Sequence, residues 1–201
     1  MMPQYLRNSS PAQAPIDGYS FASSILRAKV HVMIHVSPLS ALNSITTRLQ
    51  NYDLLTLLSP DYPPVDWSAC ERHIRLAFHD IVEPMPGFVA PDRDIMQAVL
   101  DFGRNSEHQR ALLIHCWAGI SRSSAAAFVI ACDRNPGFER DIASELRRRA
   151  PSATPNRLMV RLADDLLERN GRMIEAIDGI GRGAEAREGE PYELPLQWPI
   201  G

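Results

Sequence analysis

The chain has 201 residues, of which 45% are hydrophobic and 22% are charged, and its formal net charge is −3. This length and apolar content suffice for one well-buried core but not for two large domains. The charge gives no electrostatic basis for nucleic-acid binding, and no apolar run approaches the ~18 residues that span a membrane. We therefore expect one globular domain, with neither a nucleic acid nor a membrane as its partner.

Composition divides the chain into three segments. Residues 1–29 contain prolines without an apolar period and predict a flexible N-terminal extension. Residues 30–175 carry the periodic patterns of a folded domain. Residues 176–201 are rich in Gly, Glu and Pro and predict a flexible C-terminal tail. Alternatively, the apolar residues that alternate near its end lie against the domain: Tyr192, Leu194, Leu196 and Trp198.

Apolar periodicity within the central segment predicts strands and helices in alternation. In chain order, strands are expected at 30–36, 52–58, 73–78 and 111–115, and helices at 40–50, 92–103, 122–132, 139–149 and 156–170. This order is typical of an α/β fold with a central, mostly parallel sheet of four to five strands flanked by helices. Gly171 is predicted to cap the carboxyl end of the last helix. In such sheets, ligands bind beyond the carboxyl ends of the strands.

The most specific motif lies between the strand at 111–115 and the helix that follows it. Cys116 stands six residues before Arg122, with Gly119 midway and Ser123 directly after the arginine. A loop folded over a helix N-terminus directs backbone N–H groups at one point, where they bind an anion and stabilise a thiolate. The planar fork of Arg122 suits two phosphate oxygens, and Ser123 can donate a hydrogen bond to the sulfur. The spacing therefore predicts a sulfur nucleophile that attacks phosphorus, rather than a cysteine that merely fills the core.

The segment from His115 to Ser123 resembles the signature loop of the cysteine-dependent protein tyrosine phosphatase superfamily. Residues from about Met33 to Met173 are similar to small bacterial predicted tyrosine phosphatases, which are related to the dual-specificity phosphatases. The resemblance implies a tyrosine-phosphatase-like catalytic domain at 30–175, with Cys116 as nucleophile and Arg122 as phosphate binder. It also implies that His115 is a structural residue that supports the cysteine loop.

The rest of the loop is expected to bind the substrate phosphate through its backbone amides. These substrate-binding residues run from the nucleophile to the arginine: Trp117, Ala118, Gly119, Ile120, Ser121 and Arg122. The Trp117 side chain either packs beneath the loop or flanks the pocket, and packing is the favoured interpretation. The motif requires neither a metal ion nor a cofactor, and the three cysteines show no metal-ligand spacing.

Departure of an alkoxide or phenoxide needs a proton donor. The strand at 73–78 ends in a loop rich in proline and glycine, where Asp80 precedes the cysteine by 36 positions. Asp80 is therefore the preferred general acid, with Glu83, Asp92 and Asp94 as alternatives. The last two also suit the first turn of the helix at 92–103, where acids cap and complement the dipole.

These residues predict a phosphomonoester hydrolase that acts on phosphotyrosine or mixed phosphoprotein substrates through a phosphocysteine intermediate. Its partner is then a phosphorylated protein or a small phosphomonoester. A catalytic thiolate favours a reducing, cytoplasmic location. The competing hypothesis is a non-catalytic module that captures phosphorylated partners, and sulfur transfer of the rhodanese type is disfavoured by the Arg122-Ser123 pair.

Overall fold

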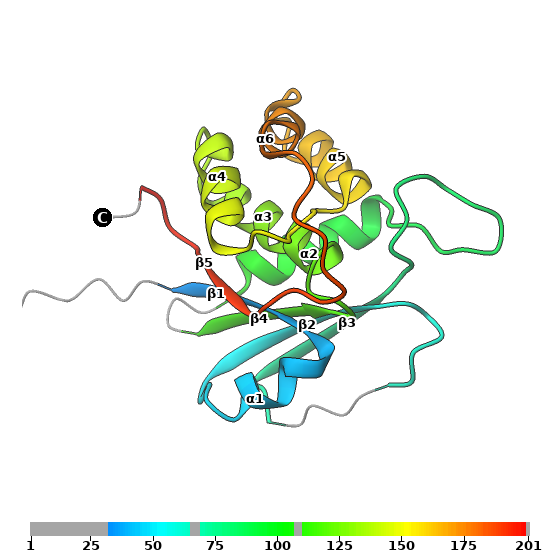
Figure 1. The fold of residues 1–201 in the computed structure, drawn as a ribbon, viewed down its shortest axis with the longest axis vertical. Helices are drawn as coiled ribbons and strands as arrows, with labels where there is room; N and C mark the ends of the chain where they lie inside the picture. The colour runs from blue at the N-terminus through cyan, green and yellow to red at the C-terminus, as the bar shows by residue number, and fades with distance from the viewer. Residues whose placement is uncertain (1–31, 65–68, 107–109, 200–201) are drawn as a thin grey trace, which may run out of the picture.

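The structure, a computed structural model, describes residues 32–64, 69–106 and 110–199 (Figure 1). A five-stranded sheet divides these residues into two layers, with one short helix on one face and the other helices on the opposite face. This arrangement confirms the predicted α/β fold with a mostly parallel central sheet. The extension predicted at 1–29 lies outside the described residues.

The sheet has the strand order β3-β2-β4-β1-β5. Four strands run parallel to one another: β1 (Met33–Pro38), β2 (Tyr52–Leu58), β3 (Arg72–Ala77) and β4 (Ala111–Cys116). The fifth strand, β5 (Tyr192–Pro195), pairs antiparallel with β1 at one edge. β2 and β4 lie inside the sheet and are buried along almost their whole length, which explains their continuous apolar runs.

The helices form two unequal layers on the sheet. The larger layer contains α2 (Arg93–Arg104), α3 (Arg122–Arg134), α4 (Glu139–Arg149), α5 (Arg157–Leu166) and α6 (Arg172–Ile180). On the other face, a 3-10 turn (Leu39–Ala41) leads into α1 (Leu42–Thr46). Leu42 and Ile45 of α1 cover a small second core that includes Tyr52. The main core lies beneath the larger layer, around the buried helix α3.

The first helix is much shorter than the predicted range of 40–50. Side-chain hydroxyls compete with the helical hydrogen bonds here, since Thr47 Oγ1 donates to the Asn43 carbonyl over 2.5 Å. Ser44 Oγ likewise donates to the Ala41 carbonyl over 2.8 Å. Such bonds favour turns over a continuing helix.

The prediction of one long helix at 156–170 is wrong. α5 ends at Leu166, and Glu168 and Asn170 both adopt positive φ values of 53°. Gly171 has a φ of 86° and begins α6 rather than capping the preceding helix. The turn is held by Asp164, whose carboxylate accepts hydrogen bonds from the N–H groups of Gly171 (2.6 Å) and Met173 (2.8 Å).

The flexible tail predicted at 176–201 is also wrong for the residues that the structure describes. Its first part completes α6, and its last part forms β5 against β1. Tyr192, Leu194 and Leu196 are buried, as the alternative interpretation of their alternation requires. Between α6 and β5, the chain crosses beside the β4–α3 loop, where Gly189 N–H donates to the Ala118 carbonyl over 2.8 Å.

Among the described residues, no helix has the length and apolar character needed to cross a membrane.

Candidate active site

The β4–α3 loop holds a cysteine between a buried strand and a buried helix. β4 ends at Cys116, one residue beyond the predicted strand, and α3 begins at Arg122, as predicted. The Cys116 side chain is 2% exposed, and every residue of α3 from Arg122 to Cys132 is buried. The loop is therefore fixed at both ends by the core.

The carbonyl groups of this loop all point away from the cysteine. Each one accepts a hydrogen bond from outside the loop: Trp117 from Leu39 N (3.1 Å), Ala118 from Gly189 N (2.8 Å), Gly119 from Ser124 Oγ (3.3 Å), Ile120 from Thr154 N (2.9 Å) and Ser121 from Ala125 N (2.9 Å). In a planar trans peptide the following N–H points in the opposite direction. The five successive amides of residues 118–122 therefore face the side of the loop where Cys116 lies, and the Gly119 N–H donates to Cys116 Sγ over 3.2 Å.

Gly119 makes this tight loop possible. Its φ of 71° lies in the left-handed region that favours glycine. A Cβ atom at this position would lie 2.7 Å from the backbone nitrogen of Pro38 at the end of β1. The loop thus rests directly on the neighbouring strand, with no room for a side chain between them.

The sulfur of Cys116 has a second polar neighbour. Ser123 Oγ lies 3.1 Å from Cys116 Sγ, and its side chain is fully buried in the first turn of α3. Together with the Gly119 amide and the start of α3, this hydroxyl surrounds the sulfur with hydrogen-bond donors and the positive end of a helix dipole.

Arg122 is held in place at one end of its guanidinium group. Its Nη1 donates to the Phe78 carbonyl over 2.8 Å and lies 3.4 Å from Ser59 Oγ. Its Nε is buried and makes no hydrogen bond within the part of the chain that the structure describes. The Phe78 and Ser59 contacts therefore orient the group and leave Nε for an anion.

The side chain of His115 contacts residues of the neighbouring strands and not the β4–α3 loop. Its Nε2 lies 2.8 Å from Thr56 Oγ1 on β2, and the same hydroxyl lies 2.9 Å from His73 Nε2 on β3. The pKa of His115 is lowered to about 4, mainly by burial; a hydrogen bond with the Cys116 backbone opposes this shift, and the charges of His73 and Arg122 add to it. His115 is therefore neutral at physiological pH and links three strands beneath the loop.

Asp80 lies beside the β4–α3 loop, although it precedes Ser121 by 41 positions in the chain. Its Oδ1 accepts hydrogen bonds from Ser121 Oγ (2.7 Å) and Asn156 Nδ2 (2.8 Å), and its Oδ2 lies 4.0 Å from Arg122 Nε. The side chain is 36% exposed, so it is held in position but open to solvent. The Asn156 amide also donates to the Ile81 carbonyl over 3.1 Å, which fixes the start of the loop that carries Asp80.

The other acidic candidates are placed differently. Asp92 caps α2, because its Oδ1 accepts a hydrogen bond from Ile95 N over 2.9 Å. Asp94 lies in the first turn of the same helix. Glu83 is exposed and lines a cavity beside α5 and α6. Of the four predicted carboxylates, Asp80 is the one whose contacts reach Ser121 and Arg122.

Several supporting residues had no signal in the sequence. Asn156 combines two tasks, since its side chain also accepts from the N–H groups of Leu158 and Met159 as the N-cap of α5. An Asn before a helix indicates the cap but not the contact with Asp80.

The favoured placement of Trp117 beneath the loop is wrong, because its side chain is 39% exposed.

Comparison of the chain with protein-family models gives no match, and comparison with curated proteins gives none either. Among solved structures, it is similar to Tk-PTP in a mutant form, with 21% identity over 66% of this chain and 86% of that chain and a TM-score of 0.46. Tk-PTP in the active form has 20% identity, coverages of 65% and 86%, and a TM-score of 0.46. DUSP15 has 14% identity, coverages of 75% and 92%, and a TM-score of 0.47. Likenesses at this distance do not assign an activity, which has to be inferred from the site itself.

Proposed function

We propose that this protein is a metal-independent phosphomonoester hydrolase that acts on phosphotyrosine or mixed phosphoprotein substrates. The observation that carries the proposal is the orientation of the 116–122 loop. Its outward carbonyls leave successive amides facing a buried cysteine, and beside them lies the Nε of Arg122, which makes no hydrogen bond within the described residues. This set of donors suits the oxygens of a phosphoryl group.

In the first step, the Cys116 thiolate attacks phosphorus. A sulfur–phosphorus bond forms as the bond from phosphorus to the leaving oxygen breaks, and protonated Asp80 gives its proton to that oxygen. The loop amides and Arg122 stabilise the negative charge of the transferring group. The product of this step is a phosphocysteine and a free alcohol or phenol.

In the second step, water hydrolyses the phosphocysteine. Asp80, now a carboxylate, accepts a proton from the attacking water, and the sulfur leaves as a thiolate. Ser123 Oγ, 3.1 Å from the sulfur, donates a hydrogen bond that stabilises the leaving thiolate. Because the proton goes back to Asp80 and phosphate departs, both residues return to their starting state.

Hydrolysis of p-nitrophenyl phosphate in the presence of EDTA tests this proposal. The wild-type protein is expected to turn over, and Cys116→Ser to fall below about one thousandth of that rate. Acid quenching during turnover should trap phosphate on the peptide that contains Cys116, as detected by mass spectrometry. Cys70→Ser changes a cysteine outside the loop and serves as the matched control, with activity retained.

Two outcomes would overturn the proposal. Turnover that survives in Cys116→Ser would exclude the cysteine as nucleophile. Saturable binding of a phosphopeptide by the wild-type protein without any turnover would instead favour the non-catalytic binding module.

A further inference from the structure

The exposed large apolar residues of the described ranges lie on the two loops that follow Asp80 and Cys116. Five large apolar side chains are 39–52% exposed: Val82, Met85, Phe88, Val89 and Trp117. Four of them follow Asp80 on one loop, and the fifth directly follows Cys116. We call these five residues the apolar collar. Exposed apolar side chains that are clustered rather than scattered indicate a binding surface.

The loop that carries most of the collar is closed at its base. His79 N–H donates to the Val89 carbonyl over 2.7 Å, and Val89 N–H donates to His79 Nδ1 over 2.9 Å. The rings of His79 and Phe88 meet edge to face, with their centroids 4.9 Å apart. Asp80 therefore follows directly after the hydrogen-bonded base of this loop. The contacts of Asp80 with Ser121 and Asn156 hold the loop against the β4–α3 loop and α5.

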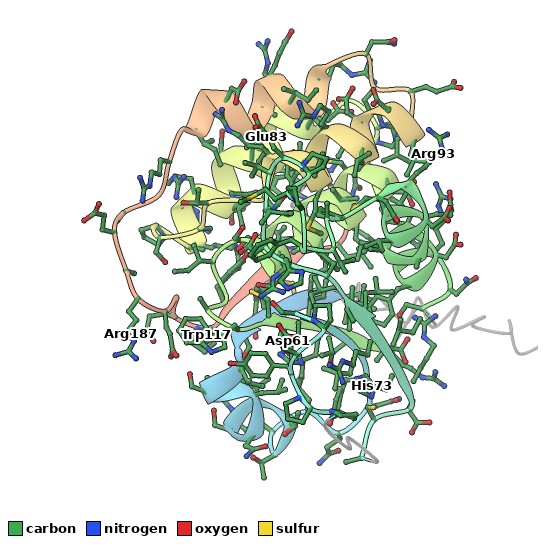
Figure 2. All side chains as sticks on the ribbon, turned by 90° about the vertical axis from the view of Figure 1, so that its right-hand side faces the viewer. Asp61, His73, Glu83, Arg93, Trp117 and Arg187 are labelled. Atoms are coloured by element: carbon green, nitrogen blue, oxygen red, sulfur yellow. The ribbon has the colours of Figure 1, made fainter. Side chains whose placement is uncertain are left out.

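Figure 2 shows Glu83, next to Val82 on the loop that carries Asp80, and Trp117 of the β4–α3 loop on the face turned toward the viewer. The hydrogen bond between Ser121 and Asp80 joins these two loops at the proposed active site.

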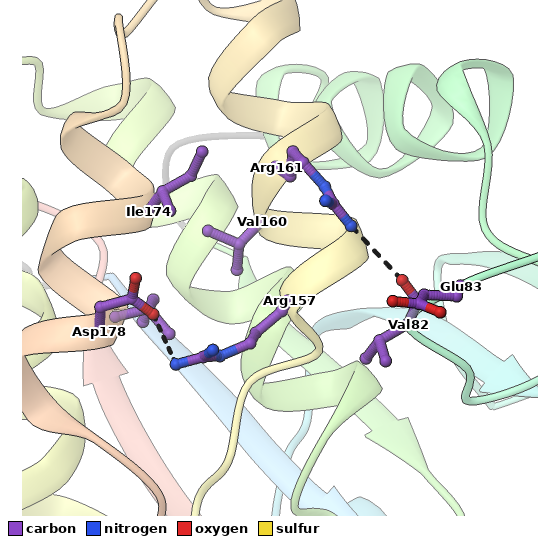
Figure 3. A pocket seen from close by; sticks show the side chains of 8 residues that line it. Val82, Glu83, Arg157, Val160, Arg161, Ile174 and Asp178 are labelled. Carbon is purple, nitrogen blue, oxygen red and sulfur yellow. Dashed lines mark hydrogen bonds and ion pairs between the residues drawn. The ribbon is translucent and has the colours of Figure 1, made fainter.

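A cavity of about 320 Å³ lies between the loop that carries Asp80 and helices α5 and α6 (Figure 3). Val82 belongs to both the collar and the cavity, which is also lined by Val160, Ile174 and Ile177. A cavity of this size accommodates a bulky side chain. Val82 thus connects the collar to a concave site near Asp80 whose lining is half apolar; its charged residues are Glu83, Arg157, Arg161 and Asp178.

The arginines at this cavity are already engaged. Arg157 pairs with Asp178 over 2.6 Å, and Arg161 donates to the Val82 carbonyl over 3.4 Å, as Figure 3 shows for these side chains. Displacing them from these partners would cost free energy. An uncharged apolar side chain can therefore pack on Val82, Val160, Ile174 and Ile177 without displacing either arginine from its partner.

We propose that the substrate is a phosphorylated polypeptide with a bulky apolar residue next to its phosphorylated residue. This inference rests on the proposed function and names the substrate class of the same site. The phosphoryl group binds the 116–122 loop, and the neighbouring apolar side chain packs on the collar and enters the cavity. A sugar phosphate or nucleotide carries polar hydroxyls next to its phosphate, and burying them against the apolar collar does not contribute to the free energy of binding.

The test uses two phosphotyrosine peptides that are identical except for the residues on either side of the phosphotyrosine, which are Leu in one and Ser in the other. Wild-type kcat/KM is expected to favour the Leu peptide by about tenfold or more, which is the scale of burying one such side chain. The double variant Val82→Ser, Met85→Ser is expected to reduce this ratio to below about threefold. Leu49→Ser makes the same kind of change near α1, away from the collar, and should keep the wild-type ratio.

Equal kcat/KM for the two peptides in the wild-type protein would overturn the proposal. So would a Leu preference that survives in the double variant, or one that is lost equally in Leu49→Ser. If p-nitrophenyl phosphate is not hydrolysed at all, the proposed function fails but the collar is still tested. Fluorescence anisotropy with Cys116→Ser then measures whether the Leu peptide binds about tenfold more tightly than the Ser peptide.

Discussion

His115 and Cys116 are neighbours on β4, but burial gives them different roles. Successive side chains of a strand point to opposite faces of the sheet. His115 faces Thr56 and the second, smaller layer of the fold, whereas Cys116 belongs to the main core and begins the loop. The histidine therefore acts on the site through the position of the strand, and not through the substrate.

The buried His115 predicts a loss of stability in mild acid. Its pKa is about 4 in the folded protein, because burial disfavours the charged ring, against ~6.5 when unfolded. As the pH falls from 6.5 toward 4, the unfolded chain binds a proton at residue 115 that the folded protein does not bind. The resulting loss of stability is absent above pH 6.5 and grows as the pH falls below it. The difference corresponds to about 3 kcal/mol near pH 4.

Urea unfolding of the wild type and of His115→Gln at pH 7 and pH 4.5 measures this contribution. Glutamine cannot titrate and can still bond Thr56, so the variant is expected to lose less stability between the two pH values. A stability loss of the same size in both proteins would show that other groups account for the acid sensitivity.

The contribution of Asp80 to the rate of turnover is expected to be larger for a leaving group that must be protonated than for one that departs as a stable anion. Asp80→Asn preserves the shape of the side chain but removes the acidic proton. Turnover of a phosphotyrosine peptide is therefore expected to fall about a hundredfold or more, and turnover of dinitrophenyl phosphate by less than about tenfold. The measurement is the rate constant for release of the leaving group from both substrates under single-turnover conditions, which isolates the first step.

Asp92→Asn is the matched control, because asparagine caps a helix as well as aspartate does. It should leave the ratio between the two substrates unchanged. Equal losses on both substrates in Asp80→Asn would assign that residue to positioning alone, and a leaving-group effect in Glu83→Gln would transfer the acid role.

At the scale of elements, the sequence predicts what local patterns determine. β2 has the predicted bounds, and α3 begins at the predicted residue, because a long apolar run and a Cys-x5-Arg loop are both local signals. Asp80 was predicted from its place after a strand, since parallel strands bring their carboxyl ends to one edge. Local patterns do not predict the end of α5, because that end depends on the hydrogen bonds of Asp164 with Gly171 and Met173.

The contacts that brace the site come from elements that no local pattern connects to it. Tyr192 OH on β5 donates to Ser124 Oγ over 3.1 Å, and Ser124 Oγ donates to the Gly119 carbonyl over 3.3 Å. Burial raises the pKa of Tyr192 well above its ordinary value, so its hydroxyl stays protonated and remains a donor. Nothing in the sequence around residue 192 indicates a link to residue 119, so the sequence alone predicts a tail at this position.

At the scale of the whole molecule, the last strand closes the edge of the sheet beside the first one. β5 gives β1 a hydrogen-bonded neighbour and covers its otherwise open edge, as Figure 1 shows. The Leu196 N–H also donates to the Val32 carbonyl over 3.1 Å, which extends this pairing. The described end of the chain is thus part of the domain whose core surrounds α3.

Two neighbouring residues on β5 distinguish this closed sheet from a loosely attached tail. Leu194 is fully buried in the main core, so Leu194→Ala is expected to lower the free energy of unfolding by about 2–5 kcal/mol. Glu193 points to the other side, where its carboxylate is half exposed and lies 3.3 Å from His35 Nδ1. Burial lowers the pKa of His35, so the ring carries little charge at neutral pH, and Glu193→Ala is expected to cost under about 1 kcal/mol. Urea unfolding followed by circular dichroism measures both variants, and if Leu194→Ala costs as little as Glu193→Ala, β5 does not belong to the cooperative core.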